Sequence, residues 1–99
     1  MTRIELAPEV LADFDRIIDH LTQFNAHDTE DRIAEVLDAI QILSHSPLIG
    51  RKVKGGKREL VIGKASHGYI ALYSYVSAID VVFVLAVRSQ RESGFKEHP

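Results

Sequence analysis

The 99-residue sequence contains no cysteine and no tryptophan. Without cysteine the chain has no disulfide, thiolate metal site or thiol nucleophile, which suits a reducing cytoplasm. Long hydrophobic runs are missing too: the longest, Val81–Val87, has seven residues, and a membrane-spanning helix needs about 20. The N-terminus has no basic region leading into an apolar stretch, so we expect no signal peptide. These absences predict a cytoplasmic protein without a membrane partner.

The length predicts a single domain over residues 1–99, but charge is distributed unevenly along it. Residues 1–50 carry three basic and ten acidic side chains, a net charge of −7, whereas residues 51–64 carry six basic and one acidic, a net charge of +5. Uneven charge of this kind is informative about binding partners. We therefore expect one region to attract anions although the whole chain has a net charge of −2.

Two amphipathic helices are predicted in the first half of the chain. The first begins at Pro8, which suits the first position of a helix, and its apolar residues recur at helical spacing up to Phe24. The second is capped by Thr29 and stopped by Pro47. Because only about four polar residues separate them, the two helices should pack as an antiparallel hairpin.

The second half of the chain changes to the period-two alternation of strands. Strands are predicted at Arg58–Ile62, Tyr69–Val76 and Ile79–Arg88, after a short first strand over residues 2–6. Short connections make the later strands antiparallel neighbours. The last strand is apolar on both faces, which favours a central position with the first strand as its second neighbour. The predicted fold is α+β, in the order β-α-α-β-β-β, with a helical hairpin on one face of a small antiparallel sheet.

The basic segment and the tyrosine-rich strand after it give the main functional hypothesis, an anionic or acidic partner. Arginine and aromatic residues on an open sheet face can contact phosphates and bases, or anchor a protein partner. The purely structural alternatives are that the basic segment is a solvated loop, that the tyrosines line the core, and that the C-terminal segment is a frayed tail. The candidate binding residues are Arg51, Lys52, Lys54, Arg58, Tyr69, Tyr73, Arg88 and Arg91.

Catalytic and cofactor sites have weaker support. The five histidines show no metal-ligand spacing, so we expect no metal. The glycine-rich stretch of residues 50–57 departs from the phosphate-binding motif and lies between a helix and a strand, the reverse of the required order, so we expect no cofactor. Arg88, in phase with Val82 and Val84, could meet Arg58 and Arg91 at one end of the sheet. The secondary candidates for catalysis are Arg58, His67 and Arg88.

The chain resembles the RelE/ParE superfamily of type II toxin–antitoxin toxins over nearly its whole length. The resemblance lies in the order of the short first strand, the helical hairpin that ends in the sequence LSHSPLIGR (residues 43–51), and the basic loop. It continues in RELV (residues 58–61), GYIALY (residues 68–73) and RSQR (residues 88–91). The ParE-like branch fits better than the RelE-like branch, because Ile70 stands where RelE-like members usually carry arginine.

The resemblance implies a toxin that inhibits DNA gyrase by binding it, takes part in plasmid stabilisation and growth arrest, and is neutralised by a cognate antitoxin. The alternative is a RelE-like endoribonuclease that cuts mRNA on the ribosome, with Arg58 and Arg88 stabilising phosphate charge and His67 or His98 moving a proton. A third possibility is a relic that binds antitoxin but no longer harms the cell.

Overall fold

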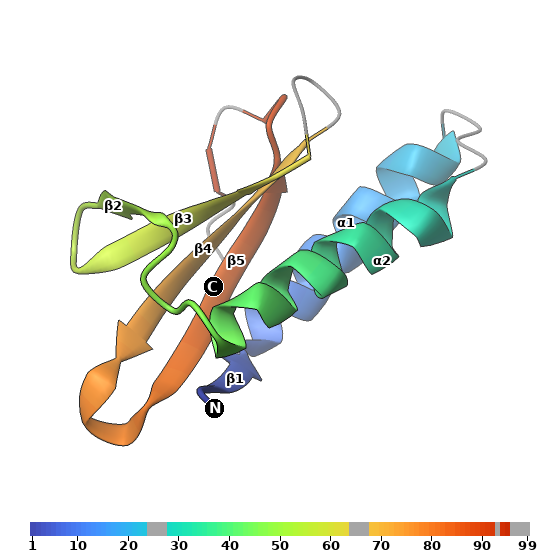
Figure 1. Ribbon diagram of the computed structural model, residues 1–99. Coiled ribbons are helices and arrows are strands. Elements are labelled where there is room, and N and C mark those ends of the chain that lie inside the picture. The colour runs from blue at the N-terminus through green and yellow to red at the C-terminus, as the bar shows by residue number, and fades with distance from the viewer. Residues whose placement is uncertain (24–27, 64–67, 93, 96–99) are drawn as a thin grey trace.

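The computed structural model describes residues 1–23, 28–63, 68–92 and 94–95. One strand and two helices come first, and four strands follow. The elements are β1 (Arg3–Leu6), α1 (Pro8–Gln23), α2 (Thr29–Gln41), η1 (Ile42–Ser44), β2 (Arg51–Val53), β3 (Lys57–Ile62), β4 (Tyr69–Val76), η3 (Ser77–Ile79) and β5 (Val81–Ser89). The two helices run alongside each other, and the β2–β3 hairpin extends away from them (Figure 1).

The helical hairpin is present as predicted, but the second helix starts differently. Thr29, expected as the cap, is the first helical residue, and Asp28 takes the N-cap position without a side-chain cap hydrogen bond. The Asp28 carboxylate instead accepts a hydrogen bond from Arg32 Nε at 3.0 Å, so it pairs with an arginine one turn away. No helix in the described part of the chain has the length and hydropathy needed to span a membrane.

The five strands form one sheet in the order β1-β5-β4-β3-β2. The predicted α+β fold is confirmed, and β5 has its predicted central place between β1 and β4. The sheet is mixed, however, because β1 pairs with β5 in parallel. The reason is β2, a short strand inside the segment expected to be a loop. The β2–β3 hairpin adds one reversal of chain direction, so β5 finishes parallel to β1.

The core lies between the helices and one face of the sheet. Side chains from α1, α2 and η1 pack there against β3, β4 and β5; its members are Val10, Phe14, Ile17, Leu21, Val36, Ile40, Leu43, Ile62, Tyr69, Ala71, Tyr73, Val82, Val84 and Val87. In β5 the register shifts so that Ala86 pairs with Leu72 and Val84 with Tyr73, which leaves Leu85 as an extra residue. This bulge reverses the side-chain alternation after it.

The bulge corrects the predicted phase of Arg88. The sequence places Arg88 on the face of Val82 and Val84, but those two valines pack in the core together with Val87. Because neighbouring residues of a strand point to opposite faces, Arg88 lies on the other face, away from the helices. The alternation of side chains along β5 predicts a buried Val87 only when the bulge at Leu85 is taken into account.

Candidate binding surface

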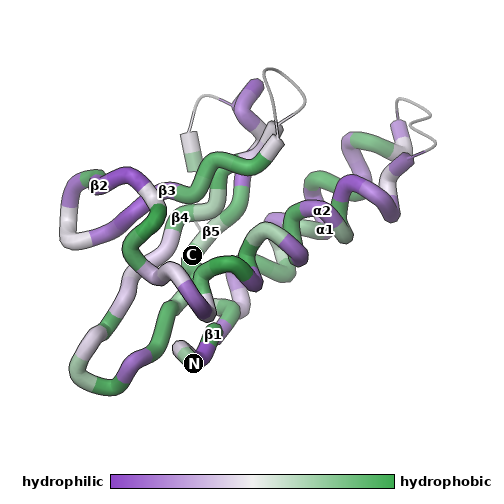
Figure 2. Tube along the Cα trace, in the orientation of Figure 1, coloured by the Kyte–Doolittle hydropathy of each residue, from purple (hydrophilic) through white to green (hydrophobic). Residues whose placement is uncertain are grey.

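The basic segment folds into the β2–β3 hairpin, whose arms are mostly hydrophilic on either side of a turn of intermediate hydropathy (Figure 2). Gly55 and Gly56 form its turn with φ values of 79° and 71°, a left-handed conformation that glycine adopts without steric cost. Lys52, Lys54 and Lys57 surround the turn and are all exposed. None of these three hairpin lysines has an ion pair with a described residue. The hairpin therefore presents uncompensated positive charge.

The two arginines of the hairpin are engaged within the protein. Arg51 pairs with Glu59, directly opposite it in the β2–β3 register, with nitrogen–oxygen distances of 3.0 and 2.9 Å. Arg58 donates hydrogen bonds to the backbone oxygens of Leu48 at 3.0 Å and Gly50 at 2.8 Å. Arg58 thus holds the loop before β2 against β3, while Arg51 remains exposed at the surface.

One tyrosine of β4, Tyr73, anchors the loop before the hairpin. Tyr69 and Tyr73 are 4% and 0% exposed, so both side chains belong to the core. The Tyr73 hydroxyl accepts a hydrogen bond from the Gly50 N–H at 2.9 Å. A Cβ at Gly50 would lie 2.7 Å from that hydroxyl and 2.8 Å from the Glu59 backbone oxygen. Glycine at this position therefore permits the close approach that anchors the loop.

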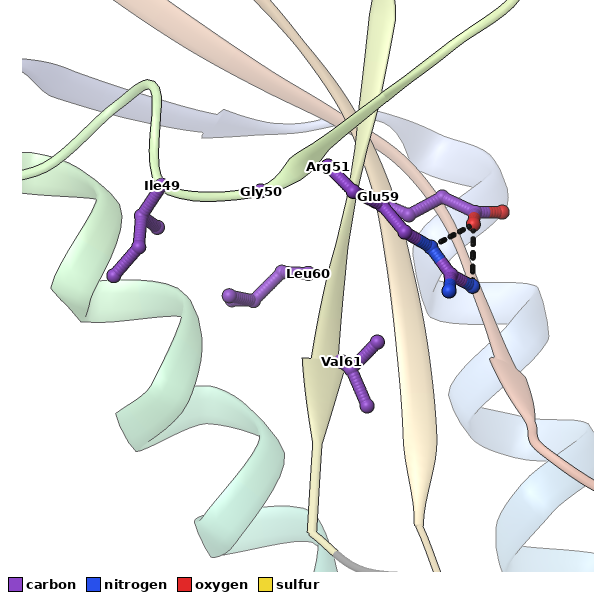
Figure 3. A pocket seen from close by; sticks show the side chains of 6 residues that line it. All are labelled: Ile49, Gly50, Arg51, Glu59, Leu60 and Val61. Atoms are coloured by element: carbon purple, nitrogen blue, oxygen red, sulfur yellow. Dashed lines mark hydrogen bonds and ion pairs between the residues drawn. The ribbon is translucent and has the colours of Figure 1, made fainter.

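An apolar groove, which the sequence analysis missed, lies beside the hairpin along the outer edge of β3 (Figure 3). This edge groove has a volume of about 360 Å³ and is lined by Ile49, Gly50, Arg51, Glu59, Leu60 and Val61. Strand β2 pairs only with Lys57–Glu59, so among the described residues no strand covers the edge of β3 from Leu60 to Ile62. The sequence feature that could have indicated this groove is the pair Leu48–Ile49, two apolar residues in a loop.

Exposed apolar side chains border the edge groove. Leu48 and Ile49 are each 58% exposed and Val61 is 47% exposed. Ile49 and Val61 line the groove and Leu48 precedes Ile49 in the chain. Exposed apolar side chains next to an uncovered strand edge are typical of a site that binds another chain.

The C-terminal arginines, Arg88 and Arg91, lie apart from the hairpin. Arg88 donates hydrogen bonds to the backbone oxygens of Ser89 at 3.2 Å and Glu92 at 2.8 Å, and its guanidinium lies 5.1 Å from the centre of the Phe95 ring. Its buried Nε has no hydrogen-bond partner among the described residues. Arg91 is exposed. Arg88 therefore packs against the segment that follows β5.

A buried polar network holds that segment against α1. Arg16 donates to the Glu92 carboxylate at 2.8 and 3.1 Å and to Asp13 at 2.6 Å. Asp13 is 0% exposed and accepts a hydrogen bond from the Val87 N–H at 2.9 Å. These contacts fix the end of β5 just after its bulge.

The structure does not bring Arg58 and Arg88 together. Arg58 lies opposite Tyr73 and Arg88 opposite Ile70, on strands separated by β4. Tyr73 and Ile70 point to opposite faces of the sheet, so the suggested meeting of Arg58 and Arg88 at one end of the sheet is wrong. The third catalytic candidate, His67, lies outside the described residues, as does His98. Within the described ranges no cluster of side chains could hold a metal ion.

Comparison with known proteins gives one matching family and a set of similar structures, of which two are described here. Residues 4–94 match the family described as "ParE toxin of type II toxin-antitoxin system, parDE". No curated protein matches the chain. The fold resembles the chromosomal ParDE toxin–antitoxin system from P. aeruginosa, with 16% identity, a TM-score of 0.73 and coverage of 90% of this chain and 96% of that one. It also resembles the intact E. coli RelBE toxin–antitoxin complex, with 18% identity, a TM-score of 0.54 and coverage of 93% and 100%.

Proposed function

Because the chain belongs to the family of ParE toxins of type II toxin–antitoxin systems, we propose that it inhibits DNA gyrase by binding it and that a cognate antitoxin neutralises it. The observation that carries this proposal is the family match, which extends over residues 4–94 and so includes every helix and strand of the fold except Arg3, the first residue of β1. The geometry supports a binding function through the edge groove and the exposed cations beside it.

The antitoxin is assigned to the edge groove. An uncovered strand edge offers backbone hydrogen bonds to an extended peptide, and side-chain pockets then give specificity. Here the edge from Leu60 to Ile62 supplies the backbone groups, and Leu48 and Ile49 supply exposed apolar surface. Arg51 and Glu59, which both line the groove and pair with each other, give it a polar end without net charge. The matching antitoxin segment is an extended stretch with alternating apolar residues and a polar group near its end.

The candidate binding residues divide into two roles. Arg51, Lys52, Lys54 and Arg91 are exposed and are assigned to direct contact with a protein partner, the antitoxin or gyrase. Arg58, Tyr69, Tyr73 and Arg88 are buried or half-buried. They are assigned to positioning: Tyr73 and Arg58 hold the loop that lines the groove, and Arg88 holds the segment after β5.

A supercoiling assay with purified gyrase tests the target. The protein alone should inhibit supercoiling, and an equimolar amount of antitoxin, encoded by the neighbouring small open reading frame, should restore it. Mapping transcripts after induction provides the second readout. Uninhibited gyrase together with cleavage inside codons of translated mRNA would contradict the proposal in favour of the endoribonuclease. Induction without any growth defect would contradict it in favour of a relic that only binds antitoxin.

A pair of matched variants tests the antitoxin site. Ile49→Asp places a charge on apolar surface at the groove, whereas Leu11→Asp places the same charge on α1, at a residue that is similarly exposed (63% against 58%). Loss of a central apolar contact at an interface typically costs 2 kcal/mol or more, about a 30-fold loss of affinity. We expect that loss for Ile49→Asp only. Equal antitoxin affinity for both variants would move the antitoxin to another surface.

A further inference from the structure

The hairpin lysines, two of which are assigned above to contact with a protein partner, lie at one end of the β2–β3 hairpin. Pairing between β3 and β4 begins at Arg58 opposite Tyr73, so the tip from Val53 to Lys57 is a ribbon of two strands without a third beside it. Figure 1 shows this tip extending away from both the helices and the β4–β5 hairpin. Lys54 and Lys57 thus lie on a narrow projection, and Lys52 lies at its base, opposite Arg58.

The charge surrounds this ribbon on both faces. In the β2–β3 register Lys52 is opposite Arg58 and Lys57 is opposite Val53. Neighbouring pairs along a ribbon point to opposite faces, so Lys52 and Lys57 lie on different faces, with Lys54 in the turn between them. A flat acidic surface could contact the lysines on only one face of the ribbon, whereas a cleft with anionic walls on both sides could contact the lysines on both faces.

The chemistry of the free cations also favours phosphate. Arginine binds carboxylates through two parallel hydrogen bonds, but both hairpin arginines are already engaged, Arg51 with Glu59 and Arg58 with backbone oxygens. The remaining cations are all lysines, which act as point charges suited to phosphate. The apolar side chain in the tip is that of Val53, which is half-buried, so the tip offers little apolar surface to anchor a protein.

We propose that the tip of the β2–β3 hairpin binds duplex DNA, with Lys52, Lys54 and Lys57 contacting phosphates on both sides of the major groove. The major groove of B-form DNA is about 12 Å wide and admits a two-stranded ribbon. Duplex RNA has a major groove too deep and narrow for side chains to enter. The ligand here is DNA itself and its binding is measured without gyrase or antitoxin, so a failure of DNA binding can be distinguished from a failure of gyrase inhibition or of antitoxin binding.

Fluorescence anisotropy with a labelled duplex of about 20 base pairs tests the proposal, using the protein without gyrase or antitoxin. Three phosphate contacts predict a slope of about −2.7 for the logarithm of the binding constant against that of salt concentration, or about a 40-fold loss of affinity between 50 and 200 mM salt. The variant K52Q/K54Q/K57Q should bind at least about tenfold more weakly than the unaltered protein. K52R/K54R/K57R, which keeps the charges, should retain binding.

A control variant separates the site from overall charge. A12E/Q23E/Q41E changes the net charge by the same three units at exposed positions on the two helices, and it should bind DNA as the unaltered protein does. Equal losses in this variant and in K52Q/K54Q/K57Q would overturn the proposal. Equal affinity for duplex RNA, or tighter binding of polyglutamate than of DNA, would also overturn it, the latter in favour of an acidic protein partner. Urea unfolding of each variant shows whether it is folded.

Discussion

Strands β4 and β5 bury half or more of their residues, whereas β2 buries none and β3 buries only Ile62. Polar groups follow the same division. Asp13 is fully buried and its bonds reach β5, while the cations of the hairpin are exposed or bonded at its surface. The helix-covered strands therefore hold the fold, and the projecting hairpin carries groups that need little support from the core. The fold and the binding surface can then vary separately.

The division extends to the choice of cation. Arg16 and Arg58 each make several hydrogen bonds that join separate segments of the chain, while the hairpin lysines have no ion pair among the described residues. A guanidinium has five donors in a rigid plane and can bridge several acceptors, whereas an ammonium remains hydrated and mobile. Arg16 and Arg58 thus stabilise the fold, whereas the hairpin lysines place positive charge at the surface.

The largest effect is expected where the helix-covered strands depend on a buried charge. Asp13→Ala removes the acceptor of the Val87 N–H and one partner of Arg16, which should lower the free energy of unfolding by about 3 kcal/mol. Asp15→Ala, an exposed neighbour on the same helix, should change it by less than about 0.5 kcal/mol. Urea unfolding measures both. Similar values for the two variants would show that β5 does not depend on this network.

A smaller loss of stability is expected where the helix-covered strands contact the loop that leads into the hairpin. Tyr73→Phe leaves the buried Gly50 N–H without its acceptor, at a cost of about 1.5 kcal/mol. Tyr75→Phe is the matched control, because its hydroxyl bonds to Asp80 at the exposed surface and its loss should cost less than about 0.5 kcal/mol. Chemical denaturation compares the two. If Tyr73→Phe costs no more than Tyr75→Phe, the loop before β2 is not anchored through this hydroxyl.

Within the hairpin the two arginines should differ from each other. Arg58→Ala removes both hydrogen bonds to the loop that lines the edge groove and should cost about 1 kcal/mol. Arg51→Ala breaks an ion pair whose arginine side chain is 61% exposed, and such pairs contribute less than about 0.5 kcal/mol. Antitoxin affinity is the sharper readout, since Arg51 is assigned to contact and Arg58 to positioning. A larger loss of stability for Arg51→Ala would reverse these roles.

How far the sequence predicts the structure also differs between the two regions. Both helices and four of the five strands are predicted close to their observed limits, because their apolar residues repeat at periods of 3.6 and 2. Strand β2 is missed because three residues, RKV, are too few to show a period. The parallel pairing of β1 follows from that same strand, and so it is missed as well.

The candidate site was less predictable than the fold. The bulge at Leu85 left no sign in the sequence, because residues 81–87 are apolar on both faces and fit either phase. The edge groove depends on where β2 stops pairing with β3, which is a property of the folded register. Positive charge on the hairpin was visible from composition alone, but its division into bonded arginines and free lysines needed the geometry of Glu59 and the backbone oxygens.

The smallest effect is expected at the exposed turn between β4 and β5, and it should depend on pH. Hydrogen bonds from Thr2 and then Tyr75 lower the pKa of Asp80 below its usual value. A carboxylate whose pKa is lower in the folded state stabilises the fold above its unfolded pKa of about 3.9, and that stabilisation disappears as the pH falls through the folded pKa.

Asp80→Asn removes this charge. Asparagine tolerates the left-handed backbone at this position, where φ is 51°, so the variant should not strain the turn. Urea midpoints measured from pH 7 down to pH 2 should show the unaltered protein slightly more stable than Asp80→Asn near neutrality, with the difference disappearing in acid. Thr2→Ala, which removes the donor that lowers the pKa of Asp80 most, should flatten the pH dependence in the same direction. A difference between Asp80→Asn and the unaltered protein that stays constant with pH would mean that the carboxylate is not linked to folding. Charge in this turn would then affect stability no more than charge in the exposed turn of the β2–β3 hairpin.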